Sequence, residues 1–265
     1  MGHVTDALVV EREEHILKLT LNRPEQLNAL NRDMQYALEA ELSAAGEDPD
    51  VRVIVVTGAG RGFCSGADMG GLRNSAEAPP DPKTFVVPKF TNRQCGIFKP
   101  TICAVNGVCA GAGLHFVADS DIVIASEAAN FVDTHVNVGQ VTALEPIGLM
   151  RRMPMSAVLR LAILGKAERL NAAQALASGM VSEVHPADQL MARAMELAQI
   201  IAAVSPAAVQ KSLKAIWDSL EMPLAQAYDN GFDLLIRHRA HPDALEGPKA
   251  FAEKRAPVWT ADSVS

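Results

Sequence analysis

The amino-acid sequence predicts an α/β fold made of repeated β-β-α units, with a mostly helical region after residue 155. Two Val/Ile-rich segments, residues 51–57 and 101–105, have the composition of buried strands, and each runs directly into a glycine-containing turn. Residues 112–118 then predict a helix, and residues 121–125 predict a further strand. Strand, turn, helix and strand in this order indicate a repeated unit rather than one doubly wound sheet.

The N-terminal segments predict a hairpin followed by a capped helix. The hairpin is predicted over residues 7–21, where Leu17, Leu19 and Leu21 alternate with polar residues at the period of a half-buried strand. Asn31 is placed to cap a helix that ends near Gly46. The apolar face of that helix consists of Met34, Leu38 and Leu42.

Two amphipathic helices are predicted after Pro186 and Pro206, and we expect their apolar stripes to form core or subunit contacts. The stripes are Leu190, Ala194, Leu197, Ile201 and Val204, then Val209, Leu213, Ile216, Trp217 and Leu220. Residues 74–90 contain four prolines and predict a mobile loop that borders a site.

The composition favours a protein that binds neither nucleic acid nor membranes. The chain has 265 residues, of which 24 are basic and 31 acidic, so its net charge of −7 gives no overall attraction to phosphate backbones or anionic lipid. No apolar run reaches the roughly 20 residues that span a bilayer, and the polar N-terminus does not resemble a signal peptide. The four cysteines show no Cys-x-x-Cys spacing, so we expect reduced thiols and a cytoplasmic location.

Two glycine-rich turns, residues 60–69 and 104–113, are the strongest candidates for a binding site. Each follows a predicted strand and opens a helix, where small residues let a ligand approach unpaired backbone N–H groups. Two such donors aimed at one point would form an oxyanion hole. The alternative is two ordinary tight turns. Neither turn carries the dinucleotide fingerprint, which argues against a nicotinamide dehydrogenase, and a phosphate-binding Gly-Lys-Ser/Thr is also absent.

The two turns also belong to an ordered set of motifs that resembles the crotonase (enoyl-CoA hydratase/isomerase) family. The set consists of Leu21-Asn22-Arg23-Pro24 with Asn28-Ala29-Leu30, Phe63 to Asp68, Ala104 to Gly113 with Asp121-Ile122, residues 158–181, and Phe251-Ala252-Glu253-Lys254-Arg255. The resemblance implies a crotonase-like spiral of β-β-α units over residues 1–195. It also implies a C-terminal helical trimerisation region over residues 196–265, in a homotrimer or a dimer of trimers.

The same resemblance implies an acyl-CoA thioester as the small-molecule partner. The thioester oxygen would be held by the backbone N–H groups of Ala67 and Ala112. The segments that match the coenzyme A site contain Gln26, Asn28, Ala29, Ser65, Ala67, Asp68, Phe251 and Lys254. Phe251 and Lys254 would approach the nucleotide from the same or a neighbouring subunit. Coenzyme A would enter as part of the substrate, and no separate cofactor is expected.

The sequence departs from the family's hydratases at both catalytic glutamates, which map onto His115 and His135. Two imidazoles can do acid/base work near neutral pH. They orient water differently from two carboxylates, because a neutral imidazole has one donor and one acceptor. Hydration by the family's usual mechanism is therefore in doubt. The alternative is that each histidine is a structural group.

Two acids close in the sequence are candidates to complete the site. If Asp133 lies on a strand, it shares the face of His135 and can orient the ring; alternatively, it caps a turn. Glu145 is the best candidate for a carboxylate that reaches the site, or else it begins a helix. A zinc site is disfavoured because His115 and His135 have no further ligand at metal spacing.

Two classes of function remain open. The first is an acyl-CoA enzyme of hydratase/isomerase type, in which His115, His135 and Glu145 act as acid/base groups around the oxyanion hole. Such an enzyme would add water, move a double bond, or hydrolyse a C–C or thioester bond. The second is an acyl-CoA-binding protein that has lost turnover. An assay with a panel of acyl-CoA thioesters discriminates between them.

Overall fold

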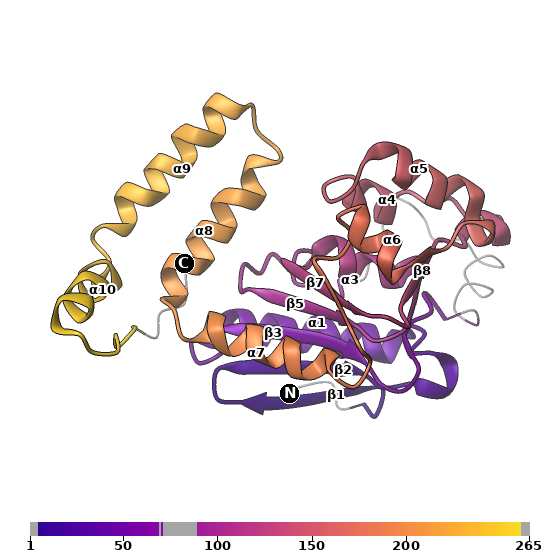
Figure 1. Cartoon of the computed structure of the whole chain (residues 1–265), viewed down its shortest axis with the longest axis horizontal. Coiled ribbons are helices and arrows are strands. Elements are labelled where there is room, and N and C mark those ends of the chain that lie inside the picture. The colour runs from indigo at the N-terminus through magenta and orange to yellow at the C-terminus, as the bar shows by residue number, and fades with distance from the viewer. Residues whose placement is uncertain (1–4, 69, 71–88, 261–265) are drawn as a thin grey trace.

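The computed structural model describes residues 5–68, 70 and 89–260 (Figure 1). The strands are β1 (Leu8–Glu13), β2 (Ile16–Leu21), β3 (Val53–Gly58), β4 (Gly62–Cys64), β5 (Thr101–Val105), β6 (Val108–Ala110), β7 (Ile122–Ser126), β8 (Asn130–Val132), β9 (Leu170–Asn171) and β10 (Glu183–His185). The α-helices are α1 (Arg32–Glu47), α3 (Leu114–Asp119), α4 (Leu144–Leu149), α5 (Met155–Leu164), α6 (Ala172–Ala177), α7 (Leu190–Ala202), α8 (Pro206–Ser219), α9 (Leu224–His238) and α10 (Pro242–Glu253). Short 3₁₀ helices are η1 (Pro24–Gln26), η2 (Gly111–Gly113), η3 (His135–Val138) and η4 (Gly165–Ala167).

The strands form two sheets, and the chain alternates between them. The larger sheet has the order β1-β2-β3-β5-β7-β10, in which only β1 runs antiparallel to its neighbour. The smaller sheet has the order β4-β6-β8-β9. The pairs β3/β4, β5/β6 and β7/β8 each place their first strand in the larger sheet and their second in the smaller. The predicted spiral of β-β-α units is therefore confirmed.

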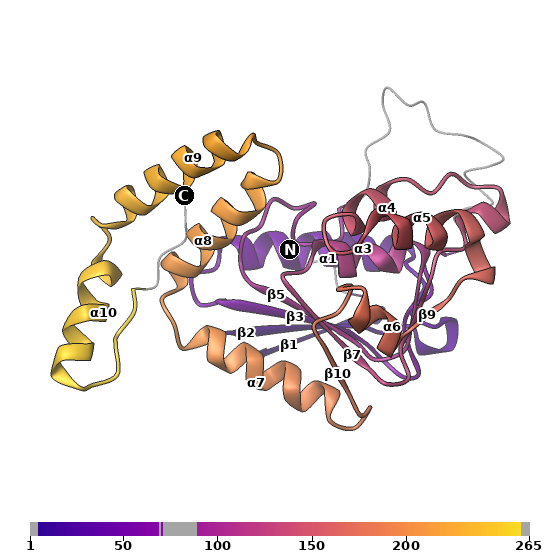
Figure 2. The same ribbon diagram turned by 45° about the horizontal axis from the view of Figure 1, so that its top comes forward.

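Aliphatic side chains fill the core on both faces of the larger sheet. On one face, helix α1 buries Met34, Leu38 and Leu42, and Asn31 caps the helix by accepting a hydrogen bond of 3.0 Å from the Met34 amide, as predicted. Helix α7 covers the other face (Figure 2). Its buried residues Leu190, Ala194 and Ala198 pack on residues of β2, β3, β5 and β7. Removing a buried leucine from such a core costs roughly 2–5 kcal/mol.

The structure corrects some of the predicted elements. Residues 112–118 do not form a single helix: they are divided between η2 and α3, and the strand β6 precedes them. The strand β4 is also absent from the predicted elements. Three-residue strands are too short to show the period of two that identifies a strand. Val204 lies beyond the end of α7 and is exposed. The predicted loop at 74–90 lies outside the described residues, apart from its last two positions.

Helices α9 and α10 stand away from the two sheets (Figures 1 and 2). The expected boundary between residues 195 and 196 falls inside α7, which packs on the sheet, so the chain leaves the core with α8. Helix α9 has no buried residue. Among the described residues, no single helix has the length and apolar character to cross a membrane; α7 and α8 meet those criteria only jointly, as a pair bent by 106°.

Candidate active site

The first glycine-rich turn is held by the loop that follows β2. The Leu30 amide donates to the Gly66 carbonyl at 2.8 Å, and the Asp68 amide donates to the Leu30 carbonyl at 3.1 Å. Successive amides of an extended segment point to opposite sides. Because the carbonyl of Gly66 and the amide of Asp68 both point toward Leu30, the N–H of Ala67 between them points away from Leu30. Ala67 therefore presents its amide on the side that does not pair with Leu30.

The second glycine-rich turn lies against the first. Ala112 is in the first turn of η2, where backbone N–H groups have no partner within the helix. Gly66 has a φ of +101°, and a Cβ placed there would lie 3.0 Å from the Ala110 oxygen and 3.5 Å from the Ala112 nitrogen. Only glycine permits this close approach. The structure therefore brings the segments of Ala67 and Ala112 together.

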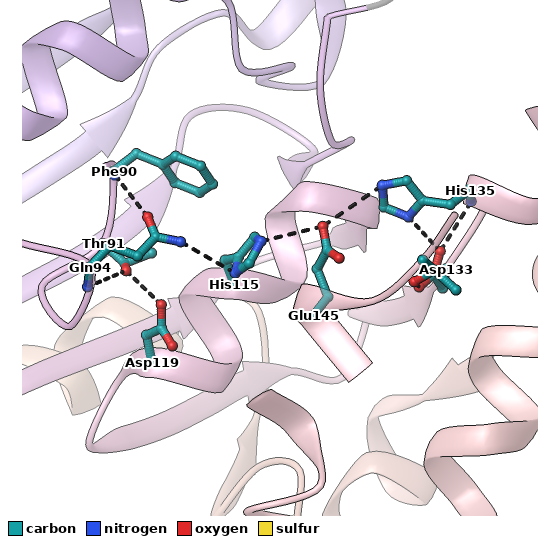
Figure 3. A network of polar contacts seen from close by, with 9 residues as sticks. Phe90, Thr91, Gln94, His115, Asp119, Asp133, His135 and Glu145 are labelled. Atoms are coloured by element: carbon teal, nitrogen blue, oxygen red, sulfur yellow. Dashed lines mark hydrogen bonds and ion pairs between the residues drawn. The ribbon is translucent and has the colours of Figure 1, made fainter. Parts of the chain in front are cut away.

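Two histidines and one carboxylate meet beside these turns (Figure 3). His115 lies on α3, and its Nε2 atom is 3.4 Å from Oε1 of Glu145. His135 begins η3, and its Nε2 atom is 3.7 Å from the same oxygen. Glu145 lies in the first turn of α4, and only 6% of it is exposed. A Cβ on Gly111 would lie 3.4 Å from Cε1 of His135, so this ring also borders the second turn.

Asp133 orients the ring of His135. The Nδ1–H of His135 donates to Oδ1 of Asp133 at 2.7 Å, which leaves Nε2 as the basic nitrogen of the neutral ring. Asp133 also accepts from the His135 amide at 3.0 Å and from the Thr142 hydroxyl. It follows β8 and does not lie on it, so the expected common strand face is wrong. The contact forms because the chain turns into η3, and Asp133 thus both caps this turn and orients the ring.

The environment shifts the pKa values of three of these groups. The hydrogen bond from His135 to Asp133 raises the pKa of His135, and the nearby charge of Glu145 adds to this, although burial opposes it. Burial works to raise the pKa of Glu145, but the hydrogen bond from His115 and the further contacts of this carboxylate outweigh it, so that this pKa is lowered. The pKa of Asp133 is lowered in the same way, because its hydrogen bonds outweigh the effect of burial. The site therefore favours two carboxylates and a readily protonated His135.

The opposite side of His115 contacts two residues that were not named as candidate site residues. Nε2 of Gln94 lies 3.4 Å from Nδ1 of His115, and the Phe90 ring meets the imidazole edge-on at 5.4 Å between centroids. Both residues lie outside the matching motifs, in a loop whose folding brings them to α3. Phe90 is the last residue of the segment 74–90 that was predicted to border a site, whereas no pattern in the sequence marks Gln94, because only tertiary packing creates its contact.

Two of the segments predicted to hold coenzyme A, residues 26–29 and 65–68, form one connected surface. Gln26 is exposed in η1, and its carbonyl accepts from the Ser65 hydroxyl at 3.0 Å. The carboxylate of Asp68 pairs with Arg23 at 3.0 Å. The carbonyl of Ala29 accepts from the same guanidinium at 2.6 Å. The residues at positions 26–29 and 65–68 therefore adjoin one another.

The side chain of Asn28 has a structural role in this surface. It is fully buried, accepts from the Arg23 amide, and donates to the carbonyls of Ala59 and Gly62. These contacts hold its backbone at a φ of +57°. The side chain of Asn28 is therefore not available to coenzyme A.

Phe251 and Lys254 are not brought to this surface within one chain. Phe251 lies on α10, and Lys254 follows this helix as its C-cap. Helix α10 is at the end of the molecule opposite to α4 and α5 (Figure 1). A contact of either residue with bound coenzyme A therefore stays a prediction.

The described residues contain no cluster of three or more histidine, cysteine or acidic side chains suited to a metal ion. All four cysteines are free thiols. Burial raises the pKa of Cys64 to about 12, which makes this thiol a poor nucleophile near neutral pH. The chemistry of the site therefore rests on the histidines, the carboxylates and the backbone amides.

A two-sheet spiral of β-β-α units, with apposed glycine turns and a buried acid/base cluster beside them, defines a protein of the crotonase fold. The family model for enoyl-CoA hydratase/isomerase matches residues 11–262. The chain belongs to the enoyl-CoA hydratase/isomerase family of the crotonase superfamily.

Individual relatives are similar over nearly their full length. Enoyl-CoA hydratase EchA19 of Mycobacterium tuberculosis is 34% identical, over 95% of each chain. The 2,3-dehydroadipyl-CoA hydratase of Escherichia coli is also 34% identical, over 94% of this chain and 97% of that protein. A crystal structure of an enoyl-CoA hydratase/isomerase from Mycobacterium paratuberculosis is 39% identical with a TM-score of 0.89, and the match covers 97% of this chain and 99% of that one.

Proposed function

We propose that the protein is an acyl-CoA enzyme that stabilises a thioester enolate between the amides of Ala67 and Ala112. His135 and Glu145, with His115 behind them, would supply the acid/base groups. The observation that carries the proposal is the convergence of His115 and His135 on one Glu145 oxygen, beside the two apposed turns. Membership of a family of acyl-CoA enzymes supports the same substrate class.

The oxyanion hole would serve each of the candidate reactions in the same way. Enolisation or addition next to a thioester places negative charge on the carbonyl oxygen. Two fixed N–H donors stabilise that charge, and removing one donor in other enzymes costs about 3 kcal/mol. The absence of a Cβ at Gly66 lets the two donor segments approach closely, which supports this role.

The acid/base group would be His135 rather than a water-binding pair of glutamates. Its neutral ring presents Nε2 as a base, while Asp133 holds the N–H on the other side. Asp133 and Glu145 would then stabilise the imidazolium that forms when the ring takes a proton. This arrangement can abstract a proton next to the thioester or activate a water molecule.

A second reaction within this proposal is hydrolysis of a C–C or thioester bond. The observation that favours it is the Asp133–His135 pair, because an imidazole held by a carboxylate is a common general base toward water. Hydratases among the relatives are joined by a 1,2-epoxyphenylacetyl-CoA isomerase of Escherichia coli at 34% identity. The family thus includes different reactions on acyl-CoA compounds.

The surface formed by residues 26–29 and 65–68 would hold the adenosine end of coenzyme A. Phe251 and Lys254 would reach it from a neighbouring copy in a homotrimer or a dimer of trimers. Coenzyme A is then part of the substrate, and the mechanism uses no other cofactor. The four free thiols agree with the expected cytoplasmic location.

The decisive experiment is an assay of the purified protein with a panel of enoyl-CoA and 3-oxoacyl-CoA thioesters. Thioester absorbance and product mass identify hydration, isomerisation or hydrolysis. We expect turnover of at least one thioester. Micromolar binding without turnover would instead assign the chain as an acyl-CoA-binding protein. Failure to bind any coenzyme A thioester contradicts the proposal entirely.

A further inference from the structure

We infer that Gln94 is a positioning residue that fixes the tautomer of His115, with the proton on Nε2 facing Glu145. The tautomer follows from the hydrogen-bond geometry alone. Its consequence for catalysis rests on the proposed function. Figure 3 shows the connected contacts from Phe90 and Gln94 through His115 and Glu145 to His135.

The orientation of the Gln94 amide is set by the backbone. The N–H of Phe90 donates to Oε1 of Gln94 at 2.9 Å, which identifies this atom as the carbonyl oxygen. The NH₂ group of Gln94 therefore faces His115. The nitrogen of this group lies 3.4 Å from Nδ1 of the His115 ring. An amide NH₂ can only donate, so Nδ1 of His115 must accept.

Glu145 requires the same tautomer from the other side of the ring. With Nδ1 as the acceptor, a neutral His115 carries its proton on Nε2, 3.4 Å from the Glu145 oxygen. A donor then meets an acceptor at both ring nitrogens. The opposite tautomer would place an N–H against the Gln94 NH₂ and a lone pair against a carboxylate. Two separate contacts therefore select one tautomer.

The loop that carries Gln94 is fixed to the core at several points. The backbone N–H of Gln94 donates to the Thr91 hydroxyl at 3.3 Å, and that hydroxyl donates to Asp119 at the end of α3. Arg93 forms a largely buried ion pair with Asp121, and its guanidinium lies 4.6 Å from the centroid of the Trp217 ring. The loop is thus tied to the same helix that carries His115, so the position of Gln94 relative to the ring is well defined.

This arrangement gives the two histidines different roles. His115 uses its proton to hold Glu145 and uses its lone pair to accept from Gln94, so neither nitrogen is free to exchange a proton with substrate. His135 has Nδ1 bonded to Asp133 and presents Nε2 to the Glu145 oxygen at the longer distance of 3.7 Å. His115 and Gln94 would therefore position Glu145, and His135 alone would be the base.

The substitution Gln94→Glu tests this inference because it keeps the shape and reverses the polarity of one contact. A carboxylate oxygen facing Nδ1 of His115 would attract a proton there. Ring ¹⁵N NMR reports which nitrogen is protonated, and the signals of His115 are those lost in His115→Gln. We expect a proton on Nε2 alone in the unchanged protein and a proton on Nδ1 in Gln94→Glu. Gln199→Glu, at an exposed site on α7, controls for the added charge.

Activity provides the second measurement. We expect Gln94→Glu and Gln94→Leu to lower kcat roughly 10- to 100-fold with little change in KM, as when a histidine loses its outer hydrogen-bond partner. A proton on Nδ1 of His115 in the unchanged protein would overturn the inference, as would an unchanged His115 spectrum in Gln94→Glu. Unchanged kcat in both variants would remove the catalytic consequence. The NMR result does not depend on turnover, so it stands or fails separately from the proposed function.

Discussion

Four ionisable side chains share one small space in this site, and their contacts give each a different chemical role. Glu145 is nearly buried and accepts from His115, while Asp133 holds the N–H of His135. The basic nitrogen that these contacts leave is therefore Nε2 of His135, whose ring borders the second glycine turn at Cε1. The proposed chemistry depends on this one atom more than on any other.

Replacing His135 is expected to abolish most of the activity. We predict that His135→Gln lowers kcat about 10²- to 10⁴-fold, the usual contribution of a general base. The measurement is kcat on the best substrate of the panel, with unfolding curves to show that the variant is folded. His15→Ala is the matched control, because His15 lies in the turn between β1 and β2 and contacts the Asp50 carbonyl. Equal activity of His135→Gln and the unchanged protein would exclude His135 as the base.

The pH dependence of kcat should report the influence of Asp133 on His135. A base must be unprotonated, so kcat rises as the pH passes upward through the pKa of His135. Asp133 raises this pKa through its hydrogen bond and charge. Asp133→Asn removes that charge, so we predict that the acidic limb of the kcat profile shifts to lower pH.

The control for this measurement is Asp188→Asn, an exposed position with the same change of charge. It should leave the acidic limb in place. A shift of the limb to higher pH in Asp133→Asn would mean that another group controls the profile.

Single residues of the site were only partly predictable from the sequence. His115, His135 and Glu145 could be proposed because they lie at or near motif positions, and the structure brings their side chains together. Gln94 could not be proposed, because its contact with His115 depends on how the loop packs on α3. The buried role of the Asn28 side chain was also hidden, since a motif match does not tell which way a side chain points.

The two glycine turns approach each other where the segment that follows β4 lies against η2. We predict that Gly66→Ala lowers both stability and kcat. A Cβ at Gly66 would press on the Ala110 carbonyl at 3.0 Å and force the turns apart. Its φ of +101° adds strain of about 1–2 kcal/mol for a residue with a side chain.

Gly96→Ala provides a matched comparison for this prediction. Gly96 also has a positive φ, of +73°, but a Cβ there would meet nothing within 4 Å. Its substitution should therefore show the backbone strain alone. Urea unfolding and kcat/KM of both variants separate strain from the displacement of the turns. Equal losses in the two variants would show that the close approach at Gly66 is unimportant.

Elements with strong end signals were predictable, and very short ones were not. The capping residue Asn31 and the spacing of Met34, Leu38 and Leu42 correctly identified α1. The strands β4 and β6 have three residues each, and they were missed because periodicity needs a longer segment. Both strands lie within the glycine-rich segments 60–69 and 104–113, so the part of the fold that forms the site was the hardest to delimit.

The arrangement of the complete chain leaves apolar surface uncovered. Leu224, Tyr228 and Phe232 recur every four residues along α9, and each is more than 60% exposed. A helix with such a stripe is stable when a partner covers it. Helix α10 carries Phe251 at the end of the molecule away from α4. One association between copies of the chain could therefore cover the stripe on α9 and bring Phe251 and Lys254 to a neighbouring site.

Disrupting that association should weaken coenzyme A binding as well as assembly. We predict that Phe232→Glu yields smaller particles, measured by light scattering during gel filtration, because a charge in the apolar stripe opposes burial. If Phe251 and Lys254 act between subunits, the same variant should bind acyl-CoA more weakly in titration calorimetry. Gln226→Glu, at another exposed position of α9, adds the same charge and should change neither property. If Phe232→Glu loses assembly but keeps its full affinity for acyl-CoA, the nucleotide contacts lie within one chain. An unchanged particle size would show that the α9 stripe is not the interface.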